Sequence, residues 1–410
     1  MLGGIEAVWG LRQLYGYAVS NHSLYVLTGS FFNPGPYSGY LAMILPVCLH
    51  QWLTKRGEIL CSDRNDGRRW KKVMDKAGTM VAGGVMLLIL CVLPAGMSRS
   101  AWLAAGVSCL CVYAWHMDWT DKFRLLWQQQ RQRVVMVVVG GFCVLLLAGY
   151  LLFVLKPDSA RGRLFMWKIT CRAIAEKPLT GYGIHNFAAA YGNAQETYFA
   201  AGDYEPWEER VAGSPEYAFN EYLRVGVEYG IPAMLSVVGL LMGAVILLLK
   251  IRIPFAYGLI AFCVFSFFSY PLSALRVRSA AEKEWESIRY LVTMEMYEDA
   301  IEELMTLRDE LDDNFRYLYD LGYSLHKVGR YNESNEVLRQ GSMFSSDPLF
   351  HVIMGKNHEA VGRYEDAEGE YLKAHHMVPG RIYPISLLMN LNIKTGDNAD
   401  AIRIGSKIKD

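Results

Sequence analysis

The residues best suited to chemistry form a basic cluster near the middle of the chain. If this segment is helical, offsets of 7 and 11 residues place Arg161, Lys168 and Arg172 on one face. Guanidinium groups bind phosphate oxygens in a bidentate fork, so this face suits a phosphate-rich ligand at a membrane surface. Anchoring to lipid headgroups explains the same charges equally well. Within 17 residues lie five cations and a single acid: Arg161, Arg163, Lys168, Arg172, Lys177 and Glu176.

An apolar stripe runs along the other side of this predicted basic helix. Leu164, Trp167, Cys171 and Ile174 form it, because their spacing brings them to one side of a helix. We therefore expect a helix that rests on an apolar surface and displays its cations.

Three segments after the basic helix carry further polar groups. Gly181 and Gly183 lie in one short turn, where they allow another group to approach the backbone closely. Residues 193–209 are rich in Tyr, Trp and acids, a composition that suits sugar rings or a mobile surface flap. The amphipathic third segment, 218–231, feeds into a predicted membrane span and places three polar residues near the membrane surface: Asn220, Glu221 and Glu228.

The motifs of several common enzyme classes are absent from the sequence. It contains no P-loop, no HExxH motif, and no CxxC pair or other zinc-ligand spacing. Of the 8 cysteines, most lie in apolar runs, where cysteine behaves as a small hydrophobic residue. We therefore expect neither a metal nor a cofactor.

Long uncharged stretches must position these residues. A bilayer core of roughly 30 Å is crossed by about 20 apolar helical residues. The weakest candidate follows Pro34 and Pro36, which break the backbone and set a helix start near Tyr37. The pattern predicts an all-α membrane protein with about six spans and excludes a purely soluble enzyme. The predicted spans are 38–53, 79–96, 100–116, 134–155, 230–249 and 254–275.

Basic residues in alternate loops predict the orientation of these spans. Lys and Arg accumulate in loops 54–78 and 117–133 and in the short link 250–253, so these loops should face the cytoplasm. The long loop 156–229 and everything after about residue 276 then lie outside the cytoplasm.

A period of about 34 residues marks the region 280–410. Four boxes, which begin at Tyr297, Tyr331, Tyr364 and Asn398, are spaced by 34, 33 and 34 residues. The Gly–x–Tyr–x–x–Ala pattern resembles the tetratricopeptide repeat, whose helix–turn–helix units stack into an α-solenoid. Such a solenoid offers a concave groove to a protein partner, and a spacer or stabilising cap is the alternative.

The net charge changes sign near residue 280, where the long apolar stretches also end. Residues 1–279 carry 26 Lys and Arg against 17 Asp and Glu, whereas residues 280–410 carry 15 against 24. Two unlike domains follow: a transmembrane domain over 1–275, which contains the loop 156–229, and a repeat domain over 280–410. Because the balances of +9 and −9 cancel, we expect no nucleic-acid partner.

Five short motifs follow one another along residues 25–275. In this order they resemble the O-antigen ligase/polymerase (Wzy-type) family of bacterial polytopic membrane glycosyltransferases, some of which carry trailing tetratricopeptide repeats. The motifs are Thr28-Gly-Ser-Phe-Phe-Asn-Pro34, Ser98-Arg99-Ser-Ala-Trp102, Arg161-Gly-Arg163 with Trp167, Gly181-Tyr-Gly183 with Phe187, and Asn220-Glu-Tyr-Leu223 with Glu228-Tyr-Gly-Ile231.

The resemblance implies a reaction, a location and a set of site residues. Family members transfer a glycan from undecaprenyl diphosphate to an acceptor hydroxyl of lipid A core, a glycan or a protein, at the periplasmic face of the bacterial inner membrane. By this resemblance the loop 156–229 and the repeats are periplasmic, and the partners are the lipid-linked donor, the acceptor and membrane lipids. The diphosphate would be bound by Arg99, Arg161, Arg163 and Arg172, and the acceptor hydroxyl activated or oriented by His185, Asn220 and Glu221.

Two departures from the family pattern keep a second hypothesis open. Family ligases have about a dozen spans, so the chain is expected to lack several N-terminal helices or to be a fragment. Many members carry His before the motif asparagine, where this chain has Phe219, and His185 is the nearest substitute in the sequence. The alternative is a non-catalytic membrane-anchored scaffold whose repeats recruit envelope proteins.

Overall fold

The protein, seen in a computed structural model, is all-helical wherever its structure is described. The structure describes residues 1–61, 69–119, 122, 124–125, 127–136, 139–141, 157–272, 279–397, 399 and 401–403, and no strand occurs in these ranges. Contacts divide the chain into two compact units. The first unit comprises Met1–Leu155, Phe219–Tyr222 and Leu235–Leu275, and the second comprises Lys156–Ala218, Leu223–Met234 and Arg276–Asp410.

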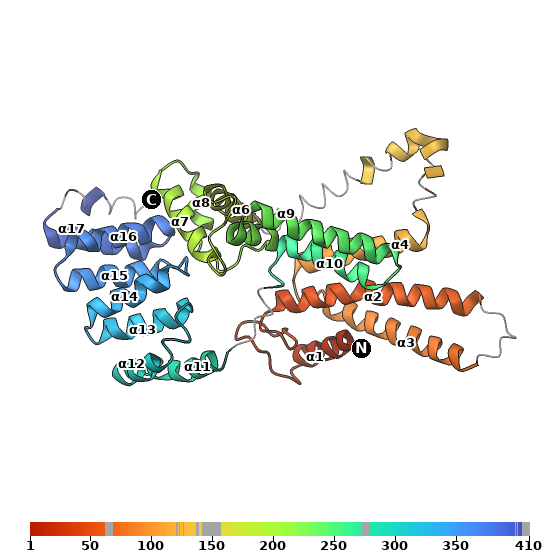
Figure 1. The fold of residues 1–410 in the computed structure, drawn as a ribbon, viewed down its shortest axis with the longest axis horizontal. Helices are drawn as coiled ribbons and strands as arrows, with labels where there is room; N and C mark the ends of the chain where they lie inside the picture. Colours follow the sequence, from red (N-terminus) through yellow and green to blue (C-terminus); the bar gives the residue numbers. More distant parts are fainter. Residues whose placement is uncertain are drawn as a thin grey trace. The chain divides into compact units, whose positions relative to one another are not determined.

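The first unit is a bundle built around α2 and α4. Helix α2 packs against α3 and α4, while α10 packs against both α2 and α4 (Figure 1). The helices are α1 (Leu2–Leu14), α2 (Pro34–Cys61), α3 (Arg69–Val92), α4 (Arg99–His116), α10 (Phe255–Phe268) and the part of α9 (Glu221–Lys250) that belongs to this unit.

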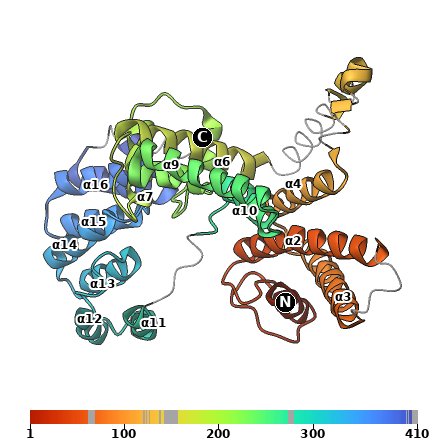
Figure 2. The ribbon, with the colours of Figure 1, turned by 45° about the vertical axis from the view of Figure 1, so that its right-hand side comes forward.

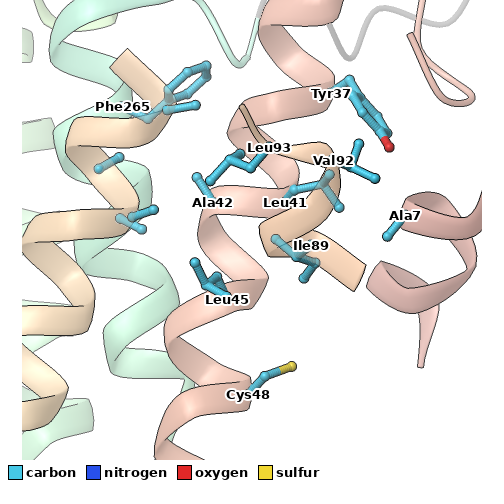
Figure 3. Close-up of a cluster of buried hydrophobic side chains, with 14 of the residues drawn as sticks. Ala7, Tyr37, Leu41, Ala42, Leu45, Cys48, Ile89, Val92, Leu93 and Phe265 are labelled. Carbon is cyan, nitrogen blue, oxygen red and sulfur yellow. The ribbon is translucent and has the colours of Figure 1, made fainter. Parts of the chain in front are cut away.

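Small residues let the helices of this bundle approach closely. A Cβ atom on Gly39 would lie 2.3 Å from the ring of Phe265, so α2 and α10 meet where α2 has no side chain. Phe265 belongs to the same buried cluster as Leu41 and Ala42 of α2 (Figure 3). Close packing of small residues is how helices associate where lipid removes the hydrophobic driving force. The bundle interior therefore has the composition expected of a membrane domain.

The N-terminal helix α1 was not predicted from the sequence. It lies against α2 and α3, and a Cβ on Gly4 would lie 2.9 Å from Val85. Ala7 is fully buried in the same core. At 13 residues, α1 is about 20 Å long, which is shorter than the roughly 30 Å of a bilayer core.

The start of α2 differs from the prediction, which placed Pro34 and Pro36 before the helix and its first residue near Tyr37. Helix α2 begins at Pro34 and includes Pro36 in its first turn. The first N–H groups of a helix have no intrahelical acceptor, so proline is tolerated there. The side chain of Asn33 accepts a hydrogen bond from the Gly35 N–H at 2.9 Å, which supports the helix start.

Two helices among the described residues are long and apolar enough to cross a membrane. They cover Val73–Val92, within α3, and Glu221–Lys250, which is α9; α10 is apolar but shorter. The predicted spans 38–53 and 100–116 fall within α2 and α4. Most of the predicted span 134–155 lies outside the described residues. The topology of about six spans therefore stays a prediction.

The second unit combines the long loop with the C-terminal helices. Helix α7 packs against α6 on one side and against α16 on the other, so it joins the two parts. Figure 2 shows the C-terminal helices following one another in a row. The helices are α6 (Pro157–Glu176), α7 (Phe187–Ala200), α8 (Pro206–Val211), α11 (Ala280–Thr293), α12 (Tyr297–Thr306), α13 (Phe315–Lys327), α14 (Tyr331–Ser342), α15 (Leu349–Ala360), α16 (Tyr364–Met377) and α17 (Ile382–Thr395).

The sequence boxes of the C-terminal region mark the starts of alternate helices. Tyr297, Tyr331 and Tyr364 are the first residues of α12, α14 and α16. The glycine two residues before the second and third of these tyrosines is left-handed: φ is +81° at Gly329 and +78° at Gly362. Glycine adopts this conformation without a Cβ penalty, so it ends one helix and lets the next turn back. The assignment to tetratricopeptide repeats itself rests on the sequence pattern.

Candidate functional site

Helix α6 carries the basic cluster, but its buried side differs from the predicted one. Phe165, Ile169 and Ala173 are at most 1% exposed and pack against α7. Leu164, by contrast, is 54% exposed, and Cys171 is also exposed. Of the four residues of the predicted stripe, Ile174 is buried, Trp167 is half-buried, and Leu164 and Cys171 are exposed, so the prediction matches the buried side only in part.

The four cations of α6 do not share one face. Arg161 and Arg172 are both exposed and, 11 residues apart, share a side of the helix at the edge of the buried stripe. Arg163 follows Arg161 by two residues, which is about 200° around a helix, and it is half-buried. The structure therefore places Arg161 and Arg172 on one side of the helix, about 16 Å apart along its axis, and Arg163 on another side.

Lys168 is held by a pair of polar residues that the sequence analysis did not select. Its ammonium group donates to Glu208 Oε1 at 2.6 Å and to the Tyr198 hydroxyl at 2.7 Å. The Glu208 side chain is only 2% exposed, and its carboxylate also accepts from the Glu205 amide at 3.0 Å. Burial alone would raise the pKa of Glu208, but these hydrogen bonds lower it below its usual value.

Arg172 is oriented by the same tyrosine. Its guanidinium carbon lies 4.4 Å from the centroid of the Tyr198 ring. A guanidinium stacked on a ring keeps its N–H donors in its own plane, where they can meet an anion. Tyr198 and Phe199 are both 3% exposed, so this aromatic segment is part of the core. Tyr198 is therefore not available to a sugar, whereas Tyr204 and Trp207 of the same segment are half-buried.

The glycine turn after α6 crosses a kink in α9. Helix α9 is interrupted at Gly230, whose φ is +84°. A Cβ on Gly181 would lie 2.5 Å from the Glu228 backbone, and a Cβ on Gly230 would lie 2.5 Å from the Leu179 carbonyl oxygen. The predicted close approach is confirmed, and the approaching group is the backbone of the protein itself.

The kink explains why the turn is bound at this point. Pro232 has no N–H, so it cannot donate the helical hydrogen bond to the Glu228 carbonyl. The Gly183 N–H donates to that carbonyl instead, at 2.9 Å. The Tyr182 N–H donates to the neighbouring Val227 carbonyl at 2.8 Å. The turn therefore supplies the donors that the kink removes from the helix.

His185 lies at the end of this turn in the second unit. Its side chain is exposed and its φ is +62°, a left-handed conformation that residues other than glycine rarely adopt. The side-chain amide of the next residue, Asn186, donates to the Tyr182 carbonyl at 2.9 Å and closes the turn.

Asn220 and Glu221 stand at the start of α9 and belong to the first unit. They are 3% and 4% exposed. Glu221 Oε1 accepts a hydrogen bond from the Leu272 N–H at 2.8 Å, which orients the carboxylate. Phe219 is left-handed, with φ at +48°, and its ring packs edge-on against Tyr270 at 5.0 Å. The place that is histidine in many family members is thus part of an aromatic contact.

Arg99 begins α4 at the turn after α3. The Ser98 hydroxyl caps the helix by accepting from the Ala101 N–H at 3.4 Å. The indole N–H of Trp102 donates to the Leu93 carbonyl at 2.9 Å and ties the turn together. A cation in the first turn of a helix adds to the positive end of its dipole, a combination that favours an anion.

The predicted site residues lie at three places in the fold: on α6 and in the turn after it, at the start of α4, and at the start of α9. Arg161, Arg163 and Arg172 share α6, and His185 lies in the following turn of the same unit. Arg99 belongs to the first unit, as do Asn220 and Glu221. Tyr198 and Glu208 lie in the segment 193–209 that the sequence singled out, but their contacts with Lys168 were not predicted. Among the described residues, no group of three or more His, Cys, Asp or Glu side chains could hold a metal ion.

Comparisons with known proteins relate the middle of the chain to one family. A family model described as O-antigen ligase matches residues 84–238, which is less than half of the chain and contains every predicted site residue. The match supports a membrane enzyme of the ligase type that transfers glycans. None of the curated proteins matches the sequence.

A comparison with solved structures finds a similarity over a smaller part of the chain. The matched structure is PcrH in complex with the chaperone-binding region of PopD, at 18% identity. It covers 33% of this chain and 99% of PcrH, with a TM-score of 0.26.

Proposed function

We propose that this protein transfers a glycan from undecaprenyl diphosphate to an acceptor hydroxyl at the periplasmic face of the bacterial inner membrane. The observation that carries the proposal is the O-antigen ligase match over residues 84–238, because the cationic helix α6 lies within it. Lipid A core, a growing glycan and a protein side chain are the acceptor classes. The donor lipid and the membrane lipids are the other partners.

The arginines would stabilise the departing diphosphate. In the transfer, the acceptor oxygen bonds to the anomeric carbon while the bond from that carbon to the diphosphate oxygen breaks. The electron pair leaves with the diphosphate, whose growing negative charge is stabilised by fixed cations. Arg161 and Arg172 face the same side of α6, and Arg172 is pre-oriented by Tyr198. Arg163 and Arg99 complete the proposed set.

The acceptor hydroxyl must lose its proton to a base or be oriented by an acceptor group. Glu221 suits this role, because its carboxylate is buried and already oriented by the Leu272 N–H. Asn220 would orient the hydroxyl beside it. His185 is the second candidate for the base. A diphosphate leaves readily without a proton, so the proposed set contains no group that protonates the leaving oxygen.

We assign the region 280–410 to tetratricopeptide repeats that lie in the periplasm together with the loop 156–229. The spacing of Tyr297, Tyr331 and Tyr364, each at a helix start, supports the repeat assignment. The basic loops 54–78 and 117–133 support the orientation. In this arrangement a protein partner can bind in the repeat groove.

Deletion of the gene and complementation with variants test the proposal. We expect deletion to remove the transferred glycan from lipopolysaccharide or from envelope glycoproteins, and the wild-type gene to restore it. Arg163→Ala should restore transfer about 10²-fold to 10³-fold less well, the usual cost of losing one group that stabilises transition-state charge. Arg163→Lys should restore it poorly, because an ammonium group cannot form the bidentate fork.

Arg210→Ala is the matched control, because Arg210 is an exposed cation in the same loop but outside the proposed site. It should restore full transfer. All variants must be present in the membrane at wild-type amounts. Full transfer by Arg163→Ala would remove the arginine from the site, and unchanged glycans in the deletion strain would contradict the proposed function.

A non-catalytic membrane scaffold is the second candidate, and one observation favours it. Phe219 occupies the place of the family histidine and packs its ring against Tyr270, and its side chain cannot exchange a proton. A scaffold predicts that deletion leaves every glycan intact but that envelope proteins are lost from the membrane fraction.

A further inference from the structure

The segment just before the Asn220–Glu221 pair is held by the C-terminal helices. We call Gly213–Glu216 the held segment, because each of its four residues accepts a hydrogen bond. The donors to its residues in order are Gln195 Nε2 to the Gly213 carbonyl at 3.0 Å, Arg381 Nη2 to Ser214 Oγ at 3.3 Å, Ser346 Oγ to the Pro215 carbonyl at 3.1 Å, and Arg316 Nη2 to Glu216 Oε1 at 2.6 Å.

Three of these four donors come from the C-terminal helical region. Arg316 is in α13, Ser346 lies between α14 and α15, and Arg381 directly precedes α17. The donors that fix the segment's backbone are buried: Ser346 is 4% exposed and Gln195 is 1% exposed. Unlike a surface salt bridge, a buried donor leaves an uncompensated polar group when its acceptor is removed. The contact is therefore a specific interface rather than a chance approach of two surfaces.

Helix α7 strengthens the same interface. The Gln195 side chain also donates to the Met377 carbonyl at the end of α16. A Cβ on Gly192 would lie 3.1 Å from the Ser346 Cα, so α7 meets this region at a residue without a side chain. Lys373 pairs with Glu196 at 3.8 Å on the outside of the contact.

Chain connectivity makes this interface relevant to the reaction. Ala218, two residues after the held segment, is 1% exposed and belongs to the core of the second unit. The next residue, Phe219, is strained in the left-handed region, and Asn220 and Glu221 follow directly. A strained residue persists only when its surroundings hold it on both sides. On one side, that support comes from the held segment.

We propose that the C-terminal helices act as a positioning clamp: through Arg316, Ser346 and Arg381 they fix the backbone that leads into Asn220 and Glu221. Arg316 and Arg381 are positioning residues and act through this backbone. The proposal rests on the proposed function only for its effect on transfer, since the clamp itself can be measured separately.

A charge exchange between Arg316 and Glu216 tests the clamp in the full-length protein. Amide hydrogen exchange of residues 211–218 is measured for wild type, Arg316→Glu, Glu216→Arg and the double variant, all purified in detergent. Each single variant should accelerate this exchange by about twofold to fivefold, since like charges replace an exposed ion pair. The double variant should return it to the wild-type rate, because the pair is rebuilt with its charges reversed.

Arg330→Glu is the matched control, because Arg330 pairs with Glu333 within its own helix start and does not touch the held segment. It should leave exchange of residues 211–218 unchanged. Unchanged exchange in Arg316→Glu, or acceleration by Arg330→Glu to the same extent, would overturn the clamp.

Glycan transfer by the same variants in membranes tests the positioning role. Both single variants should lower kcat at least about fivefold with a smaller change in the acceptor KM, and the double variant should recover. Accelerated exchange with wild-type kcat would overturn the positioning role. If wild type itself transfers no glycan, the proposed function fails while the exchange measurements still decide whether the clamp exists.

Discussion

At the scale of single residues, the glycine turn after α6 is the most closely determined part of the site. Gly181→Ala would place a Cβ at 2.5 Å from the Glu228 backbone, in a residue whose φ is +67°. We expect a loss of about 2–4 kcal/mol, which combines the left-handed penalty with the clash. The thermal unfolding midpoint of the purified protein measures it.

Gly202→Ala separates the two causes. Gly202 also has a left-handed φ, +74°, but no atom lies within 4 Å of its Cβ position. It should lose only about 1 kcal/mol. Equal midpoints for the two variants would show that the turn does not press against α9.

The residues of the site were predictable to different degrees. The close approach at Gly181 was visible because only glycine tolerates it. The sequence did not show that the α9 backbone is the group that approaches, because a bound ligand would require a glycine at this position just as a backbone carbonyl does. The buried side of α6 was misplaced because Leu164 and Phe165 are both apolar, and only packing against α7 selects Phe165.

At the scale of elements, a polar network couples α13, α14 and α15. Asn357 accepts from His326 Nδ1 at 2.6 Å and donates to Asn335 Oδ1 at 2.7 Å, and Asn335 donates to His358 Nε2 at 3.3 Å. Because Nε2 accepts, His358 is neutral there. Burial lowers the pKa of His358 and of His326.

This network predicts that the C-terminal helices lose stability in acid. An unfolded histidine titrates near pH 6.5, and the folded pKa lies lower. Between the two values the unfolded state binds more protons, so stability is full above about pH 6.5 and falls as the pH drops below it. Amide exchange of residues 315–360, corrected for intrinsic rates, should therefore accelerate from pH 7.5 to pH 5.5.

His358→Gln tests the assignment, because the glutamine oxygen can accept from Asn335 but cannot titrate. It should reduce the acceleration between pH 7.5 and pH 5.5. An unchanged pH dependence would show that His358 does not carry the effect.

The sequence predicted the helix positions of the C-terminal region more accurately than those of the N-terminal region. The period of Tyr297, Tyr331 and Tyr364 located helix starts, because each repeat meets the same local packing. Helix α1 was missed because its 13 residues are too few for a membrane span and because Glu6 and Arg12 interrupt its apolar pattern. It is recognisable only by the small residues that face Val85 and Ile44.

At the scale of the whole chain, the opposite charges of the two domains do not describe the contacts that form. The balances of +9 and −9 alone would favour contacts between the acidic repeats and the basic loop. In the second unit the polarity is reversed at two ion pairs: Arg316 meets Glu216 and Lys373 meets Glu196. Net charge acts at long range, whereas contacts depend on the few residues within about 8–10 Å.

The orientation of the chain is the last prediction and the one on which the periplasmic site depends. Loops 54–78 and 117–133 carry most of the basic residues near predicted span ends, and such loops stay in the cytoplasm. A reporter that is active only in the periplasm should therefore be active when fused after Asp410 and inactive when fused near Arg69. A cytoplasmic reporter should give the opposite pattern at the same two positions. Because α7 packs against both α6 and α16, we expect α6 and the C-terminal helices on the same side of the membrane. Activity of the periplasmic reporter near Arg69 would place α6 and its arginines on the cytoplasmic side, where transfer at the periplasmic face could not use them.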